Sequence, residues 1–240
     1  MGARTSGGHA TGAPTVTVSA RTRHATWLAA LFVIAFLTPY VLADTLEIQR
    51  DVYYALYGGI AITFAWAWGR ATEQSWYQMI ARRWRLTLLL ATIGGAVLVP
   101  AAMRAEDAGE RADGFALLGQ LLWRGGFYGA VDGFVLAALP ILIVYAAFDH
   151  ARFSTRSLAS KAGIVLAAFA ATLAMTTVYH LGYSDFRSQK VTKPLIGNPL
   201  WSIPTLATAN PIGAPIAHAV LHVTAVLRNE DSDTFLPPHY

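Results

Sequence analysis

Long apolar runs separated by short polar stretches dominate the hydrophobic pattern of this chain. A run of roughly 18 or more apolar residues is long enough to cross the hydrocarbon core of a bilayer as an α-helix. The pattern therefore predicts an all-α protein, a polytopic membrane helix bundle with about six transmembrane helices. The first five are expected near residues 27–43, 52–69, 86–103, 126–148 and 161–181, with a short amphipathic or re-entrant piece at 114–124.

The sixth apolar stretch, residues 198–227, differs from the others because prolines interrupt it. Beyond its first turn it contains Pro204, an Asn210-Pro211 step and Pro215. Proline removes a backbone hydrogen bond, and a freed backbone group inside a membrane costs several kcal/mol unless a protein group satisfies it. We therefore expect a last segment that is broken by Asn-Pro/Pro between residues 210 and 215 and that lies inside the bundle.

Two histidines follow this break four residues apart, His218 and His222. This spacing places both imidazoles on one face of a helix. Imidazoles at membrane depth can ligate a divalent metal, ligate haem or carry protons. His180 is a third candidate, at the end of the fifth span between Tyr179 and Tyr183. The less specific alternative is that the pair only hydrogen-bonds to neighbouring helices and that His180 belongs to an interfacial His–Tyr belt.

A polar stripe is expected on the fourth span, where Gln120, Arg124, Tyr128 and Asp132 recur at i+4 steps. Arg124 and Asp132 would lie about 12 Å apart along the helix axis, so each needs another partner. An intramembrane Arg or Asp is a functional-site candidate, although Arg124 could instead reach water from the membrane boundary. Small residues at every fourth position of the same span predict close packing against another helix: they are Gly125, Gly129 and Gly133.

Composition supports a membrane protein and excludes several kinds of site. The chain is 55% hydrophobic and only 13% charged, whereas soluble domains have about a quarter charged residues. It contains no cysteine, which excludes disulfides, thiolate nucleophiles and zinc sites with cysteine ligands. The net charge of +4 gives no support for nucleic-acid binding. The expected partner is the lipid bilayer, and a larger membrane complex is a further candidate.

Three regions are expected: a flexible cytosolic leader at residues 1–24, a single membrane domain at 25–227 and a polar C-terminal tail at 228–240. We interpret the first apolar run as an uncleaved span, and the alternative is a signal peptide with a cleavage site at residues 41–43. Basic residues are enriched in the segments assigned to the side of the N-terminus. That asymmetry predicts a multi-pass protein of the cell membrane with both termini cytoplasmic. The loop 182–197, with three basic residues, is the exception.

Three short motifs resemble those of the CPBP family of intramembrane proteases, which includes the CAAX prenyl proteases. The segment Gln120-Leu-Leu-Trp-Arg-Gly is similar to the end of the family's EExxxR motif. The segment Thr176-Thr-Val-Tyr-His lies where the FxxxH motif would be, and His218-Ala-Val-Leu-His lies where the Hxxx(N/D) motif would be. The order matches, and the resemblance covers about residues 115–225.

The resemblance implies an intramembrane helical scaffold with Arg124, His180 and His218 at the family's site positions. A glutamate is thought to activate water in that family, and the residues that replace it here cannot accept the proton. The resemblance therefore applies to the fold more directly than to protease activity. The departures are Gly119 and Gln120 for the two glutamates, Thr176 for the phenylalanine and His222 for the final Asn/Asp.

Together these patterns predict catalytic candidates His180, His218, Arg124 and Asp132, and metal-ligand candidates His180, His218 and His222. The expected function is a CPBP-like membrane protein that hydrolyses or binds a membrane-embedded substrate. A divalent metal is the candidate cofactor, with haem as the alternative. Two other functions stay open: a small transporter or proton-coupled carrier, and an accessory subunit of a larger membrane complex.

Overall fold

The computed structural model of the protein describes residues 19–105, 107–232 and 235–238. Across these ranges the regular elements are helices and no strand occurs, which confirms the all-α prediction. The longer ones are α1 (Ala20–Thr38), α2 (Arg50–Ala71), α4 (Trp84–Ala105), α8 (Leu158–Leu181), α9 (Thr192–Thr208) and α10 (Gly213–Arg228). Shorter pieces are a π-helical end of α1 (Pro39–Thr45), α3 (Trp76–Ala81) and 3₁₀ turns at His150–Thr155, Ser184–Phe186 and Gln189–Val191.

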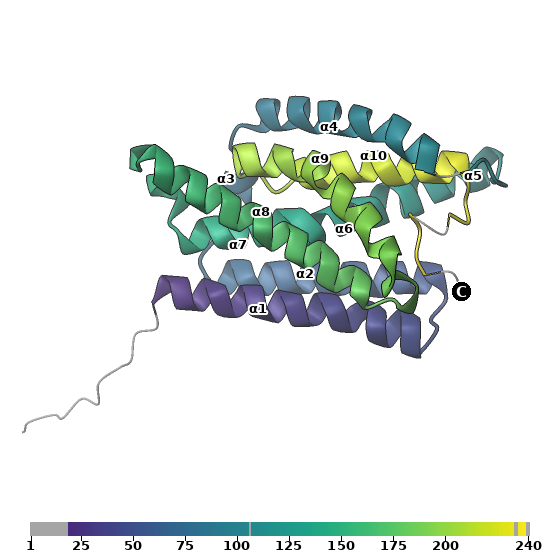
Figure 1. Ribbon diagram of the computed structural model, residues 1–240, viewed down its shortest axis with the longest axis horizontal. Helices are drawn as coiled ribbons and strands as arrows, with labels where there is room; N and C mark the ends of the chain where they lie inside the picture. The colour runs from purple at the N-terminus through teal and green to yellow at the C-terminus, as the bar shows by residue number, and fades with distance from the viewer. Residues whose placement is uncertain (1–18, 106, 233–234, 239–240) are drawn as a thin grey trace, which may run out of the picture.

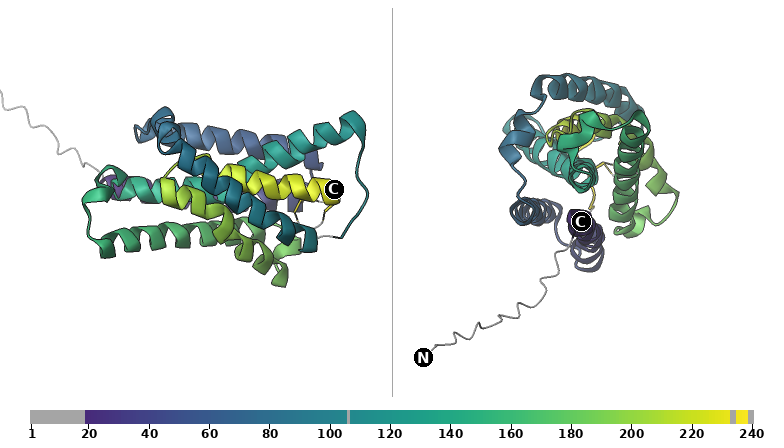
Figure 2. Two further views of the ribbon diagram at one scale, coloured as in Figure 1. Left: turned by 90° about the horizontal axis from the view of Figure 1, so that it is seen from above. Right: turned by 90° about the vertical axis from the view of Figure 1, so that its left-hand side faces the viewer.

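One further helix, which we call the central helix, runs from Gly114 to Ala147. It consists of α5 (Gly114–Gln120), α6 (Gly129–Gly133) and α7 (Leu139–Ala147), joined by π-helical turns at Leu121–Tyr128 and Phe134–Ala138. The sequence-based split into a separate piece at 114–124 and a span at 126–148 is therefore wrong. Seen end-on, the other helices surround it (Figure 2).

Four helices in the described ranges are long and apolar enough to cross a membrane: Ala20–Thr45, Trp84–Ala105, the central helix and Leu158–Leu181. This fits a membrane-embedded protein. In an apolar 18-residue stretch of the central helix 72% of the residues are buried, against 22% to 39% in the corresponding stretches of the other three. Its 34 residues would span about 51 Å, more than the roughly 30 Å hydrocarbon core. Its first part, Gly114–Gln120, contains no buried residue, and the buried residues are concentrated between Gly129 and Tyr145. The predicted number of six spans stays a prediction.

The interruption after α9 lies at residues 209–212, within and just before the predicted stretch 210–215. Ala209 has a left-handed backbone (φ 54°) that ends α9, and Pro215 lies inside the first turn of α10. Asn210 Nδ2 donates to the carbonyl oxygens of Ile80 and Arg82 at 2.8 and 2.7 Å. The turn is thus tied to the segment around α3. Side chains also satisfy its own backbone: Thr205 Oγ1 donates to the Asn210 carbonyl at 3.0 Å, and Ile212 N donates to Asn210 Oδ1 at 3.1 Å.

The chain reverses direction at this turn. At the start of α9, the neighbouring Arg187 pairs with Asp44 at 2.8 Å, while at its end Ala207 accepts from Arg83 at 3.3 Å. α10 then returns, and the carbonyl of Arg228 accepts from Gly109 N at 3.0 Å. α9 and α10 are therefore an antiparallel pair within this bundle. This geometry does not support the prediction that residues 198–227 form one broken segment.

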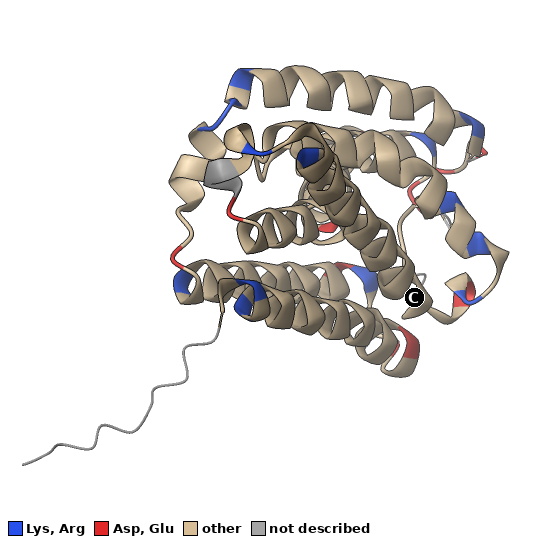
Figure 3. Ribbon diagram, turned by 60° about the vertical axis from the view of Figure 1, so that its left-hand side comes forward, with Lys and Arg blue, Asp and Glu red and all other residues tan. Residues whose placement is uncertain are grey.

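The start of α1 and the C-terminal residues lie at opposite ends of the bundle (Figure 1). Arg50, at the far end of the α1–α2 pair, donates to the carbonyl oxygens of Glu230 and Pro238 and pairs with Asp231 at 3.0 Å. The predicted polar tail therefore packs back on the helices over its described part. Charged residues gather mostly at helix ends and in connections (Figure 3). Of the predicted leader 1–24, residues 1–18 lie outside the described ranges.

Candidate functional site

Glycines of the central helix bring α10 close enough to form the site. A methyl group added at Gly133 would stand 2.6 Å from His218 Cβ and 2.8 Å from the carbonyl oxygen of Ala214. One added at Gly129 would stand 2.8 Å from His222 Cβ. These are shorter than normal van der Waals contacts, so only glycine lets the two helices approach this closely. The predicted small-residue pattern therefore packs against the segment that carries both histidines.

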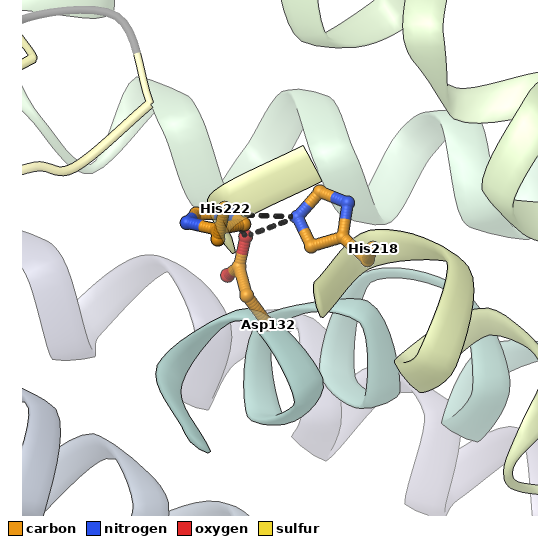
Figure 4. Close-up of side chains that lie close together, drawn as sticks. All are labelled: Asp132, His218 and His222. Atoms are coloured by element: carbon orange, nitrogen blue, oxygen red, sulfur yellow. Dashed lines mark hydrogen bonds and ion pairs between the residues drawn. The ribbon is translucent and has the colours of Figure 1, made fainter. Parts of the chain in front are cut away.

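Asp132 of α6 and two side chains of α10, His218 and His222, point toward one another (Figure 4). All three are buried, each with 3% of its surface exposed. His218 Nε2 lies 2.9 Å from Asp132 Oδ2 and 3.1 Å from His222 Nε2, and His222 Nε2 lies 3.9 Å from the same carboxylate oxygen. One ligand atom from each residue lies within 4.8 Å of the other two.

The three distances match what a bound metal ion requires. Ligand atoms around tetrahedral Zn²⁺ stand about 3.3 Å apart, given metal–ligand distances of about 2.0–2.1 Å. The observed separations of 2.9, 3.1 and 3.9 Å bracket that value. Without a cation, two imidazole nitrogens and a carboxylate oxygen would have to share protons at one buried point. A metal ion would satisfy all three lone pairs together.

Neighbouring aromatic side chains orient these three residues. The Tyr57 hydroxyl donates to Asp132 Oδ1 at 3.1 Å, which leaves Oδ2 to face the histidines. The His222 ring packs edge-to-face on Tyr128 with centroids 5.1 Å apart, and the His218 ring on Trp201 with centroids 4.4 Å apart. Both Nδ1 atoms are buried without a hydrogen-bond partner, so aromatic packing and not a second hydrogen bond fixes the orientation of the two rings.

The cluster lies at one side of a cavity of about 310 Å³. This volume is at the lower end of the range of about 300–1,000 Å³ for small-molecule sites. α4 and α9 form most of the remaining wall with apolar side chains, apart from Lys193 at the start of α9. Phe235 and Pro237 of the C-terminal segment complete it. The cavity therefore has a polar side, formed by Asp132, His218 and His222, and a mostly apolar side.

His180 lies in the same cavity wall but not in the three-ligand group. Its Nδ1 is 2.7 Å from the carbonyl oxygen of Thr176. A carbonyl only accepts hydrogen bonds, so Nδ1 carries the proton and Nε2 carries the lone pair in the neutral ring. His180 thus has the tautomer of a base, and its predicted part in metal ligation has no support in this geometry.

Arg124 does not line the cavity. Its Nε and Nη2 donate to the two carboxylate oxygens of Asp51 at 3.1 and 3.0 Å, and Nη1 donates to the Glu230 carbonyl at 3.4 Å. Partial burial would raise the pKa of the Asp51 carboxyl, but the hydrogen bonds and charge of Arg124 outweigh it and hold that pKa below its usual value. The structure therefore brings together three of the four predicted catalytic residues: Asp132 and His218 in one contact, and His180 in the same cavity.

Sequence reasoning missed Tyr57 and the buried tyrosines around it. Tyr179 and Tyr183 had been noted only as neighbours of His180, yet the hydroxyl of Tyr179 lies 2.9 Å from that of Tyr183 and 3.2 Å from that of Tyr53. The Tyr57 ring stacks on Tyr179 with centroids 5.3 Å apart. The available signal was the run Tyr53-Tyr54-x-x-Tyr57 in an apolar span, because buried tyrosines need partners for their hydroxyls.

Comparisons of the chain with protein-family models, with curated proteins and with solved structures gave no match.

Proposed function

We propose that the chain is an integral membrane protein that binds one divalent metal ion through Asp132, His218 and His222 and hydrolyses a membrane-embedded substrate in the adjoining cavity. The observation that supports this most is the convergence of three buried ligand atoms within 4.8 Å of one another. A buried cluster of this kind is costly unless a cation neutralises it. Two imidazoles and one carboxylate suit Zn²⁺ with an open position, and also Fe²⁺.

A divalent ion in this place supplies a Lewis acid and an acidified water. The chain's own residues supply the rest. Tyr57 holds the Asp132 carboxylate in its ligating orientation. His180, with its lone pair on Nε2, is the candidate to take a proton from water and return it to the leaving group. The apolar wall excludes bulk water and binds the substrate's hydrocarbon part.

A CPBP-like scaffold is part of this proposal. Two of the three carried-over positions, His180 and His218, line one cavity, as the resemblance implies. The third, Arg124, pairs with Asp51. The carboxylate that Gly119 and Gln120 lack would come from Asp132.

Haem ligation by both histidines has less support than metal binding. Two axial ligands must face each other across a porphyrin, whereas His218 Nε2 and His222 Nε2 are in direct contact at 3.1 Å. The transporter alternative relied on two half-helices in one segment, and the antiparallel arrangement of α9 and α10 removes that support.

Metal content tests the proposal. The purified protein should hold about one Zn²⁺ or Fe²⁺ per chain by elemental analysis. Asp132→Asn, His218→Ala and His222→Ala should each lose it, because three ligands form the site. The matched control is His24→Ala, a buried histidine in α1 that accepts from Trp68 Nε1 at 3.3 Å. A wild-type protein without metal, or equal metal in all five proteins, would contradict metal binding.

Hydrolysis is tested with a medium-chain 4-nitrophenyl ester. Chelation should abolish turnover, and added metal should restore it. His180→Ala should lower the rate by about 10²–10⁴-fold while the metal content stays unchanged. A His180→Ala protein with full turnover would exclude His180 as the base.

Localisation in a cell membrane with both termini in the cytoplasm was the sequence-based expectation. The opposite placement of the α1 start and the C-terminal segment supports termini on opposite sides. Because the chain has no cysteine, single cysteines at the exposed positions Ser19 and Asp107 can be labelled with an impermeant maleimide. We expect only one of them to react in intact cells. Labelling of both, or of neither, would argue for the same side.

A further inference from the structure

The wall of the cavity has a strong division between apolar and polar parts. Along α4 it is formed by Leu98, Ala101, Ala102 and Ala105, and along α9 by residues that include Leu200. Lys193, at the start of α9, is a charged side chain of this wall, whereas the other α4 and α9 side chains before Trp201 carry no group that could hold a sugar, a nucleotide or a peptide backbone. The apolar wall of α4 extends from Leu98 to Ala105, seven steps along the helix or about 10 Å at the usual helical rise. It therefore fits a hydrocarbon chain of medium length.

The polar corner favours an anion, an inference that rests on the proposed metal site. A divalent ion held by one carboxylate and two neutral imidazoles has a net charge of +1. That charge would lie among residues with 3% exposure, where water cannot screen it. A ligand with one negative charge would neutralise it, and a carboxylate oxygen is a suitable ligand for Zn²⁺ or Fe²⁺.

A second group in the same wall also needs an acceptor. Trp201 lines the cavity, is only 2% exposed, and its Nε1 has no hydrogen-bond partner. Indole nitrogen can only donate, and a buried donor left unpaired costs about 1–3 kcal/mol. The Trp201 ring packs against His218 with centroids 4.4 Å apart. The unpaired donor therefore belongs to a residue that contacts the metal cluster.

We infer that the natural ligand of this cavity is an amphiphilic monocarboxylate, a fatty-acid-like molecule bound with its carboxylate inward. One carboxylate oxygen ligates the metal held by Asp132, His218 and His222, and the head group accepts the hydrogen bond of Trp201. The chain lies between α4 and α9, toward Phe235 and Pro237. Such a molecule is also the acid product expected from hydrolysis of an acyl ester or amide in this site.

The test uses metal-loaded protein in lipid nanodiscs with radiolabelled decanoate as the probe. Decanoate should bind at one per chain, and decanol and methyl decanoate should compete at least 100-fold less well, because neither carries the charge. Octanoate should bind more weakly than decanoate, by about fourfold for each methylene lost. Equal competition by decanol or methyl decanoate would overturn the inference, since the head group would then not be recognised.

Wall variants locate the binding without touching a ligand residue. Ala102→Leu should weaken decanoate binding at least tenfold by filling the cavity. Because Ala102 is buried, Ala101→Phe provides a second variant at an exposed position of the same wall. Ala96→Phe, on the same helix but outside the cavity wall, is the control and should bind decanoate normally. Unchanged binding in both wall variants would place decanoate elsewhere and overturn the inference.

Elemental analysis of the same samples separates the two proposals. Metal present without a preference for carboxylate would remove this inference and leave the metal site intact. No metal in the wild-type protein would remove the proposed function and this inference together.

Discussion

Two polar groups on the central helix have opposite character. Near one end, Arg124 forms a two-point ion pair with Asp51 at 3.1 and 3.0 Å, and the Asp51 side chain is 39% exposed. Near the middle, Asp132 meets His218 and His222 in full burial. The first group pairs a cation with an anion, so each has its partner. The second places one carboxylate oxygen and two imidazole nitrogens at one buried point, with separations of 2.9, 3.1 and 3.9 Å, and includes no arginine or lysine.

This difference in partners separates the two groups more clearly than their position in one apolar helix does. Arg124 and Asp132 are both ionisable residues within one apolar helix, and a rule based on that position alone would treat them alike. The ion pair of Arg124 needs nothing further. The Asp132 cluster lies on a cavity of about 310 Å³ and leaves both Nδ1 atoms without hydrogen bonds. Whether the charges within a polar group balance one another therefore distinguishes an ion pair that only joins two helices from a candidate binding site.

The largest effect is expected from closing the space between the central helix and α10. Gly133→Ala places a methyl group 2.6 Å from His218 Cβ and 2.8 Å from a backbone oxygen, and overpacking of this kind costs typically about 1–3 kcal/mol. We expect loss of metal and a lower thermal midpoint. Gly119→Ala, with open space around the added methyl, should keep both. If Gly133→Ala retained full metal affinity, close approach of the helices would not be what assembles the site.

An intermediate effect is expected from the hydroxyl that orients Asp132. Tyr57→Phe removes the donor to Oδ1, and loss of such a supporting hydrogen bond typically weakens metal binding by about 10–100-fold. Titration with a competing chelator measures it. Tyr54→Phe is the matched control, because the Tyr54 hydroxyl is buried without a hydrogen-bond partner, and it should bind metal as the wild type does. Equal affinities in the two variants would show that Tyr57 does not support the ligand.

The smallest effect is expected at the ion pair. Arg124→Gln should leave the metal content unchanged and lower the thermal midpoint by about 2–4 °C near neutral pH, since a partly exposed pair contributes on the order of 1 kcal/mol. The folded-state pKa of Asp51 lies below its unfolded value, so the stabilisation is present above about pH 4. It disappears as the pH falls through the folded pKa.

Melting curves from pH 3 to 7 check this dependence, with the exposed Arg111→Gln as the control. A gap between wild type and Arg124→Gln that stays constant down to pH 3 would rule out the ion pair as its cause. Loss of metal in Arg124→Gln would instead show that metal binding by the Asp132 cluster depends on the Arg124–Asp51 ion pair.

Several features of the fold and site were predictable because they depend on local pattern. Apolar length identified the helices, and the i,i+4 spacing placed His218 and His222 on one face. The glycines at every fourth residue correctly indicated a close helix contact. The split of 114–148 failed because π-helical turns at Leu121–Tyr128 and Phe134–Ala138 keep one helix continuous through this region. The partner of Arg124 was not predictable, since Asp51 lies 73 residues away in sequence.

By itself, the sequence determined the all-helical class with its long apolar segments, the proline-rich interruption near Asn210 and the residue types capable of chemistry. Those depend on hydropathy, backbone geometry and side-chain chemistry, which are properties of short segments. Only the tertiary structure decided that α9 and α10 run antiparallel, that Asp132 meets both histidines, and that His180 stays outside the ligand group. These depend on which helices lie side by side, and such contacts join residues as far apart as Asp132 and His218, 86 positions along the chain.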